Sequence, residues 1–499
     1  MSAAAAETQP DVAVVAGVEV GTDHLIGSRR VGSARRFEDL SPIDGRVLAR
    51  VARGGAAEAE AALEAATEAF EGWAALGPEG RLPPLLRLAE LIDANVDRIA
   101  SVECEDMAML LDSLRKRVIS RGARNYRSYA ELAAAYQERV WDSNGTHNRV
   151  LRMPAGPAVV ITPWNAPFML STWKTAPALA AGCTVVLKPA EWSPLSCSLL
   201  ADLTLEAGLP PGVFNLVQGI GEEAGAALVS NPLARRISFT GSPEAARSIG
   251  RAAAANLVPF TGELGGKGPL VVFADADLDD AAERAAGMYD DSGQVCLAGT
   301  RLIIDAGIAA SFRERFDALV DDHVLGDPRE PETTVSPLIH PEHLARVEGF
   351  VERARVAGDR IVRGGRRADV GGSRDGLWYE PTLIEPVSND SEIVQREVFG
   401  PVLTWQTFDS EEEAIRLANS TDYGLSAIIC TGSAERADRV GRLVRAGTTW
   451  VNAFLVRDLT APFGGMGISG IGREGGDYAL DFYSDLKTLQ IREGTTHGS

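Results

Sequence analysis

The sequence predicts an α/β fold in which strands and helices alternate to build parallel sheets. Short β-rich runs at 158–162, 184–188, 213–217 and 236–240 are separated by amphipathic stretches of about 12 to 15 residues, the pattern of βαβ units. A second alternating series begins at 269–273 and runs to 448–452. The 499 residues, 45% of them hydrophobic, supply enough apolar material for a large core and favour more than one domain.

Helical segments precede the first of these runs. Residues 56–76 are rich in Ala and Glu with helical spacing, and two further helical stretches are expected near 82–111 and 115–139. About the first 15 residues are expected to form a loose tail. The Asn-Gly at 144–145 marks a hairpin turn. Segment 486–492 alternates apolar and polar residues, so we expect an edge strand, which often pairs with another subunit.

The composition excludes several classes of partner. A net charge of −20 repels phosphate backbones, so a nucleic acid is not expected to bind. No apolar run approaches the roughly 18 to 20 residues that cross a bilayer, and the N-terminus lacks a basic region typical of a secretion signal. The five cysteines include no C-x-x-C pair and the six histidines have no metal-ligand spacing. We therefore expect a cytoplasmic protein without a metal site.

Two short segments carry residues suited to covalent catalysis. Cys296 lies in D-S-G-Q-V-C-L-A-G-T-R, where Gly293 permits close backbone approach, and a thiolate at this position would be a strong nucleophile. Glu263 lies in T-G-E-L-G-G-K, at the end of a short apolar run, where a carboxylate can act as a general base. Taken alone, each residue has a plainer interpretation: a buried structural cysteine and a solvated turn glutamate.

Polar residues also follow two predicted strands. Asn165, in T-P-W-N-A-P, can donate its side-chain amide to an oxyanion, although Asn after a strand more often forms an Asx-turn. Lys188 and Glu191, in V-L-K-P-A-E, follow a strand of the predicted parallel sheet. Nucleotides bind at such strand ends, so both side chains can reach ribose hydroxyls. The plainer alternative for this second pair is an ion pair in an exposed loop.

Glycine-rich turns complete the set. Gly219, Gly221 and Gly225 follow a strand and open a helix, but their G-x-G-x-x-x-G spacing is one residue longer than the usual dinucleotide fingerprint. A second turn, F-T-G-S, occupies 239–242. In E-V-F-G-P, at 397–401, a carboxylate and an aromatic ring can contact a nicotinamide ribose and ring, whereas the simpler interpretation is a helix end before proline.

The chain resembles the aldehyde dehydrogenase superfamily in the order and spacing of P-W-N, K-P-A-E, F-T-G-S, E-L-G-G-K, G-Q-V-C, E-V-F-G-P and P-F-G-G, from about Pro42 to Lys487. The resemblance implies that Cys296 is the nucleophile, that Glu263 activates the deacylating water, and that Asn165 with the Cys296 backbone N–H forms the oxyanion hole. It implies NAD as the coenzyme, held by Trp164, Lys188, Glu191, Gly221, Gly225, Gly241, Ser242, Leu264, Glu397 and Phe399.

The resemblance also implies a fold and a reaction. A Rossmann-type NAD domain is expected from 1–131 and 150–264, an α/β catalytic domain from 265–470, and a small β oligomerisation arm from 132–149 and 471–499. The arm implies a homo-oligomer, either a dimer or a tetramer. The expected reaction oxidises an aldehyde to a carboxylic acid through a thiohemiacetal and a thioester, and a glutamate at 263 fits members that hydrolyse the thioester better than those that transfer it to coenzyme A.

A narrower resemblance concerns the substrate. R-G-A-R-N-Y-R, V-R-D-L and G-I-G-R-E-G-G resemble the branch that oxidises 2-hydroxymuconic and 2-aminomuconic semialdehydes. That branch implies that Arg121 and Arg457 bind the substrate carboxylate. The alternatives are that Arg457 pairs with Asp458 and that Arg121 lies on a solvated basic face. At the level of function, the alternatives are a neutral-aldehyde dehydrogenase of broad specificity and a non-catalytic binding protein of the same fold.

Overall fold

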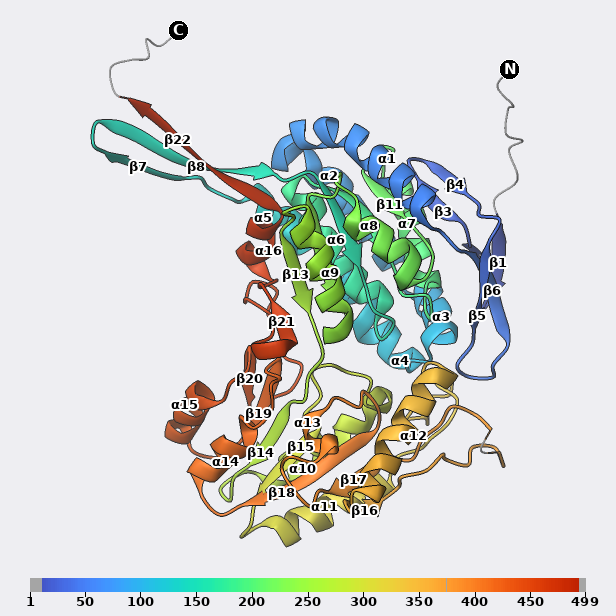
Figure 1. Cartoon of the computed structure of the whole chain (residues 1–499), viewed down its shortest axis with the longest axis vertical. Helices are drawn as coiled ribbons and strands as arrows, with labels where there is room; N and C mark the ends of the chain where they lie inside the picture. The colour runs from blue at the N-terminus through green and yellow to red at the C-terminus, as the bar shows by residue number, and fades with distance from the viewer. Residues whose placement is uncertain (1–10, 374, 493–499) are drawn as a thin grey trace.

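The computed structural model describes residues 11–373 and 375–492, which form two α/β lobes and a projecting arm (Figure 1). The first lobe contains an eight-stranded sheet with five parallel central strands and antiparallel strands at both edges. In sheet order the strands are β21 (Gly470–Ile471), β13 (Phe260–Glu263), β12 (Arg236–Thr240), β9 (Pro157–Ile161), β10 (Thr184–Lys188), β11 (Phe214–Leu216), β3 (His24–Ile26) and β4 (Arg29–Val31).

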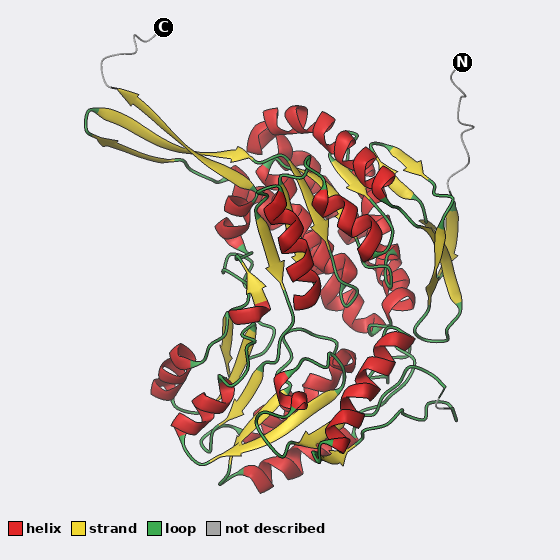
Figure 2. Ribbon diagram, viewed as in Figure 1, coloured by secondary structure: helices red, strands yellow, loops and turns green. Residues whose placement is uncertain are grey.

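The central strands are buried on both faces, which explains their continuous apolar sequence. Val160 and Leu187 pack into the core on one side of the sheet, whereas Val159 and Val186 pack on the other, as the two-residue period of a strand requires. The helices of this lobe, shown in red in Figure 2, are α1 (Ala56–Ala75), α2 (Gly77–Ala94), α3 (Val96–Met107), α4 (Leu111–Ser113), α5 (Ile119–Ala134), α6 (Pro167–Ala181), α7 (Leu195–Glu206), α8 (Ala226–Ser230) and α9 (Pro243–Ala255).

The second lobe contains a seven-stranded sheet that is parallel except at one edge. Its order is β16 (Arg360–Arg363), β17 (Thr382–Glu385), β18 (Val402–Phe408), β15 (Arg301–Asp305), β14 (Pro269–Val272), β19 (Ser426–Cys430) and β20 (Thr448–Val451). Its helical segments are α10 (Leu278–Ala286), η3 (Gly287–Gly293), α11 (Ala309–Asp321), α12 (Pro341–Val356), α13 (Glu392–Gln395), α14 (Glu411–Ala418) and α15 (Ala434–Leu443).

The arm projects from the first lobe (Figure 1). It is a three-stranded antiparallel sheet in the order β22 (Ser484–Arg492), β8 (Thr146–Pro154) and β7 (Arg139–Ser143). The predicted hairpin turn is confirmed, since Asn144 and Gly145 join β7 to β8, both with positive φ. The predicted edge strand is also confirmed as β22. It follows α16 (Gly476–Phe482), which η4 (Gly467–Ser469) and β21 precede.

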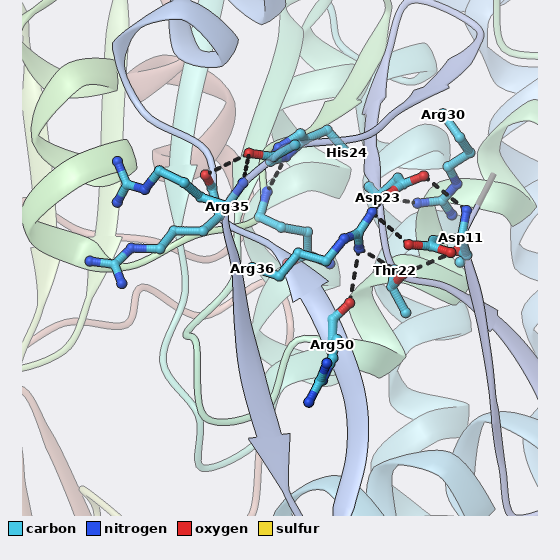
Figure 3. Close-up of polar contacts among 12 residues, drawn as sticks. Asp11, Thr22, Asp23, His24, Arg30, Arg35, Arg36 and Arg50 are labelled. Atoms are coloured by element: carbon cyan, nitrogen blue, oxygen red, sulfur yellow. Dashed lines mark hydrogen bonds and ion pairs between the residues drawn. The ribbon is translucent and has the colours of Figure 1, made fainter. Parts of the chain in front are cut away.

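The N-terminal segment corrects the predicted tail. Residues 1–10 lie outside the described residues, but residues 12–15 are not loose: they form β1 (Val12–Val15), which pairs with β2 (Val18–Gly21). Figure 3 shows the polar contacts that hold this segment, in which Arg36 donates to Asp23 at 2.6 Å and pairs with Asp11 at 2.8 Å. A second hairpin, β5 (Arg36–Leu40) with β6 (Val47–Ala52), continues from it.

The predicted helices are found, with three differences. The stretch predicted to extend to about residue 139 ends with α5 at Ala134, and Arg139 begins β7. The stretch near 82–111 is two helices, α2 and α3, because Asn95 adopts a non-helical conformation between them. Two single π-turns also occur, η1 (Leu114–Val118) directly before α5 and η2 (Gly221–Gly225) before α8. Such turns are often found at functional sites. Among the described residues, no helix is both long and apolar enough to cross a membrane.

Candidate active site

The register of the first sheet brings predicted site residues together at the carboxyl ends of its parallel strands. Lys188 pairs with Ile161 at the ends of β10 and β9, and Glu263 pairs with Thr240 at the ends of β13 and β12. The loops that follow these strands therefore emerge together. They form one wall of a cleft of about 770 Å³, and α12 and the segment after α13 form the other. The predicted residues that line it are Trp164, Asn165, Gly241, Ser242, Leu264, Cys296, Glu397 and Phe399.

Cys296 is half-buried in this cleft. It follows η3, in which Asp291 and Ser292 both have positive φ, at 50° and 54°. Non-glycine residues rarely adopt this conformation, and the strain is offset here because the Ser292 hydroxyl donates to the Ser336 carbonyl. Burial raises the pKa of the Cys296 thiol to about 12, and the charges of Glu397 and Glu263 act in the same direction. The resting thiol is therefore protonated.

Asn165 lies beside this loop rather than in an isolated Asx-turn. Its side-chain amide donates to the Gln294 carbonyl at 3.0 Å, and the Gln294 side chain in turn accepts from the Ile339 backbone N–H at 3.0 Å. These bonds fix the amide plane on the cleft wall. Because an amide nitrogen carries two hydrogens, the second can still be donated to a ligand at the cleft.

Glu263 is 5% exposed, and neither of its carboxylate oxygens has a hydrogen-bond partner among the described residues. Burial raises its pKa well above the ordinary value, and the neighbouring Glu474 raises it further. Lys174, Arg457 and Arg473 act in the opposite direction. A buried, unpartnered carboxylate is costly to the fold, which makes it a candidate for a chemical role.

A buried ion pair near Glu263 was not predicted. Lys174, from α6, pairs with Glu474 and donates to Ser238 at 3.0 Å, and the Trp173 indole donates to Glu474 at 2.6 Å. The pair joins residues 300 positions apart. Glu474 lies in the G-R-E-G-G string used for the narrower resemblance, but no local pattern connects that string to Lys174.

The predicted nucleotide-binding residues lie at the same strand ends. Lys188 is 1% exposed and forms the ion pair with Glu191 that was the plainer alternative, at 3.2 Å. Glu191 is only partly buried, so its carboxylate can still accept from a ribose, whereas the Lys188 side chain is almost fully buried. Ser242 caps α9 and accepts from the Ala245 N–H at 3.1 Å. The three therefore stand at strand ends and a helix N-terminus, where anionic dinucleotides bind.

The far wall of the cleft carries Glu397 and Phe399. Glu397 accepts from the Gly266 N–H at 2.7 Å, and burial raises its pKa to about 7. Phe399 has φ of 65° and packs edge-on against Trp164, with ring centroids 5.2 Å apart. The His343 ring donates to the Phe399 carbonyl at 2.7 Å, which holds this strained residue in place. A carboxylate and an aromatic ring thus face the cleft, as a nicotinamide riboside requires.

Arg457 lies close enough to Glu263 and Cys296 for their charges to act on it, and Arg121 lies close enough to Arg457 for the same effect. The guanidinium carbon of Arg457 lies 3.7 Å from the Phe463 ring centroid and 5.1 Å from that of Trp173. Burial lowers its pKa, whereas Glu263, Cys296 and Glu474 raise it. Arg457 does not pair with Asp458, whose carboxylate accepts from Thr460 instead.

Arg121 is not on a solvated face either. It is half-buried, and its Nε is buried without a hydrogen-bond partner in the described chain. Burial lowers its pKa to about 10, and the charge of Arg457 contributes. The charges of the two guanidinium groups therefore act on each other, and neither group forms an ion pair with a carboxylate in the part of the chain that the structure describes. No group of three or more metal-ligating side chains is present in the described ranges.

A thiol and a fixed amide line the cleft, and a buried carboxylate stands at the end of strand β13, a combination suited to covalent thiol catalysis. The chain belongs to the aldehyde dehydrogenase family, whose model matches residues 30–489. It is 40% identical to the 2-hydroxymuconic semialdehyde dehydrogenase of Pseudomonas sp. (strain CF600), with 94% of this chain and 99% of that protein covered.

Two further relatives mark the range of the family around this chain. A betaine aldehyde dehydrogenase of Cereibacter sphaeroides (strain ATCC 17025 / ATH 2.4.3) is 39% identical, with 91% of this chain and 93% of that protein covered. The crystal structure of an indole-3-acetaldehyde dehydrogenase in complex with NAD⁺ is 36% identical, with a TM-score of 0.92 and 95% and 97% of the two chains covered. The predicted fold class and the predicted family are confirmed.

Proposed function

We propose that this enzyme oxidises aldehydes that carry a distal carboxylate, such as 2-hydroxymuconic semialdehyde, with NAD as coenzyme. The observation that carries the proposal is the pair Arg121 and Arg457, two half-buried guanidinium groups that form no ion pair with a carboxylate among the described residues. Arg457 lies within reach of the charges of Cys296 and Glu263, and Arg121 lies within reach of that of Arg457. Leaving two cations partly desolvated is costly, and a bound carboxylate would offset that cost with charge-assisted bonds.

NAD would lie along the cleft, where Ser242 stands at the N-terminus of α9 and the pyrophosphate would bind. Glu191, Gly221 and Gly225 are not among the described residues that line the cleft; from the loop after β10 and from η2, Glu191 would accept from the adenosine ribose hydroxyls and the two glycines would allow close backbone approach. Glu397 can accept from the nicotinamide ribose, while Trp164, Leu264 and Phe399 line the cleft around it. When bound, NAD accepts a hydride.

The protein residues perform the acylation as follows. The Cys296 sulfur forms a bond to the aldehyde carbon as its proton leaves to solvent, which gives a tetrahedral thiohemiacetal oxyanion. The Asn165 amide and the Cys296 backbone N–H donate to that oxygen, and because Gln294 already fixes the amide, little reorganisation is needed. Loss of the hydride from the carbon then leaves a thioester on Cys296.

Deacylation requires a base, and Glu263 is suited to this role. Its raised pKa makes its carboxylate a stronger base than an exposed glutamate. It removes one proton from water, the water oxygen bonds to the thioester carbon, and the carbon–sulfur bond breaks. The acid leaves and the Cys296 sulfur regains a proton.

The arginine pair would orient the substrate as well as bind it. Guanidinium groups bind carboxylate bidentately, so the far end of a short conjugated chain would be fixed while its aldehyde carbon lies at Cys296. The semialdehyde dehydrogenase relative supports this choice. The betaine aldehyde dehydrogenase relative supports the second candidate, a broader aldehyde specificity, but a cationic or neutral substrate would leave both arginines unpaired.

The test is Arg457→Gln, assayed with 6-oxohexanoate and with its methyl ester. Loss of one charge-assisted bond of about 1.5 to 3 kcal/mol should lower kcat/KM for the anion roughly 10- to 150-fold and change that for the ester little. Arg124→Gln is the control, since it removes the charge of an exposed arginine from α5, the helix that carries Arg121. An equal loss on both substrates would show that Arg457 supports the fold, and the carboxylate proposal would fall.

We also propose that the arm, 132–149 with 471–499, assembles the enzyme into a homo-oligomer. In the sheet order β22 is an edge strand, and Leu486 is 59% exposed on it. An unpaired apolar edge is a natural site for pairing with a second copy.

We further propose that the chain divides into an NAD domain (1–131 and 150–264) and a catalytic domain (265–470). We also propose a cytoplasmic location, which is supported by the described cysteines, all of them free thiols.

A further inference from the structure

The contacts of Arg457 connect the substrate end of the site to the base. Its guanidinium lies against the rings of Phe463 and Trp173. Phe463 is followed by Gly464, which is so close to the base that a Cβ there would lie 2.9 Å from Glu263 Oε1. Trp173 donates to Glu474, the acidic neighbour of that base. Each ring that contacts the Arg457 guanidinium is therefore one step from Glu263: Phe463 through the next residue, Gly464, and Trp173 through its hydrogen bond to Glu474.

The other cations around Glu263 already have partners. Lys174, from α6, is paired with Glu474. Arg473, from the loop before α16, donates to the carbonyls of Gly465 at 3.0 Å and Gly472 at 2.6 Å. Arg457, from the loop after β20, makes ring contacts only among the described residues. Of these three cations, Arg457 is thus the one without a hydrogen bond or an ion pair in the described chain, and its N–H groups are free to bind a ligand carboxylate.

The same charge acts on both reacting groups. Arg457 opposes the effect of burial on the pKa of Glu263 and on that of the Cys296 thiol, so in the free enzyme it favours their anionic forms. A carboxylate bound to Arg457 would remove this effect. The negative charge of the ligand would then favour the protonated form of Glu263, which makes its carboxylate a stronger base.

We propose that the carboxylate of an anionic substrate, by neutralising Arg457, strengthens Glu263 as the base that deacylates the enzyme. The inference rests on the proposed function and adds a consequence to it. An anionic acyl group remains on Cys296 while its far end occupies Arg457, so the base is strengthened during the step that needs it. A neutral acyl group leaves Arg457 unpaired and Glu263 a weaker base. Arg457 acts here as a positioning residue, through its field on Glu263.

The experiment measures decay of the acyl-enzyme by chemical quench after a single turnover, as a function of pH. The acyl groups come from 6-oxohexanoate and from its methyl ester. The acid limb is the pH range in which protonation of Glu263 lowers the rate of deacylation. With the wild-type enzyme, we expect the midpoint of this limb to lie about 1 pH unit higher for the anionic acyl-enzyme than for the ester. A shift of this size is the low end of the effect of a nearby unit charge on a pKa. The rate on the alkaline plateau should be higher for the anion.

Three variants test the cause. Arg457→Gln should abolish the difference between the two acyl groups, with both acid limbs at the higher pH. Arg457→Lys keeps the charge and should retain a difference, which separates a lost charge from a damaged fold. Arg124→Gln, which removes an exposed charge from α5, should leave the difference unchanged.

The outcomes separate this inference from the proposed function. Coincident acid limbs in the wild-type enzyme, together with selective loss of the anionic substrate in Arg457→Gln, would overturn the coupling and leave the substrate class intact. A difference that persists in Arg457→Gln would also overturn it, because another group would then transmit the charge. Unchanged substrate selectivity in Arg457→Gln would instead overturn the proposed function.

Discussion

Replacement of Glu263 by Gln removes the proposed base and preserves its shape. We expect a stoichiometric burst of NADH, followed by turnover slowed by about 10²- to 10⁴-fold, the usual contribution of a positioned base. The thioester should then accumulate on Cys296, because its formation does not need the carboxylate but its hydrolysis does. Stopped-flow absorbance follows the burst, and mass spectrometry of the quenched enzyme detects the acyl adduct.

The structure also predicts the effect on stability. Glu263 is 5% exposed and its oxygens have no hydrogen-bond partner in the described chain, so its ionised form disfavours the fold. Its folded pKa lies above the unfolded value of 4.5, and the cost of ionisation therefore grows as pH rises above that value. The free energy of unfolding of Glu263→Gln should equal or exceed that of the wild type, with a gain that increases with pH.

A contrasting variant tests the assignment. Glu474→Gln also removes a buried carboxylate from this region, but it leaves Lys174 without its ion-pair partner. We expect a loss of about 3 to 5 kcal/mol in the free energy of unfolding, since the remaining charge is buried and unpaired. If Glu263→Gln turned over at the wild-type rate, or melted lower than Glu474→Gln, the base would have to be sought elsewhere and our reasoning on Glu263 would be wrong.

Three further outcomes are expected. Cys296→Ala should abolish NADH formation yet retain binding of NAD, measured by fluorescence titration, because the thiol alone forms the thioester. Glu191→Gln should raise kcat/KM for NADP by about 10-fold, since a 2′-phosphate near a carboxylate is repelled by a few kcal/mol before solvent softens the effect; no change would place the ribose elsewhere. Burial raises the pKa of Asp39 to about 7 and that of its partner Asp106 well above 3.8, so both bind protons more tightly when folded and stability should fall as pH rises from about 4 to 7. In Asp39→Asn this fall, followed by denaturant unfolding, should be smaller.

The strand ends of the first sheet could be predicted because their signals are local. The runs at 184–188 and 236–240 coincide with β10 and β12, and the motif residues that follow them, Lys188 and Ser242 among them, emerge at one edge by parallel register. The second wall of the cleft, which includes Glu397, could be predicted only from the order of the family's motifs. Such positions follow from a chain segment and its immediate neighbours.

Other features depend on contacts that the sequence does not display. The Lys174–Glu474 pair forms only when α6 meets the loop before α16, and neither segment shows a local sign of the other. The π-turn η1 depends on how α4 and α5 join, not on a composition signal. Similarly, β1 has only four residues, so its sequence alone does not indicate that it pairs with β2.

The segment between β13 and β14 links the two lobes with almost no room for variation. A Cβ at Gly265 would overlap the Glu397 carboxylate, and one at Gly266 would overlap the Cys296 carbonyl. The loop that leaves β13 of the first sheet is therefore packed tightly against residues of the second lobe. A chimera that joins the first lobe of this enzyme to the second lobe of a relative must match both sides of this crossing. The natural breakpoint between two lobes is here the least suitable place to recombine them.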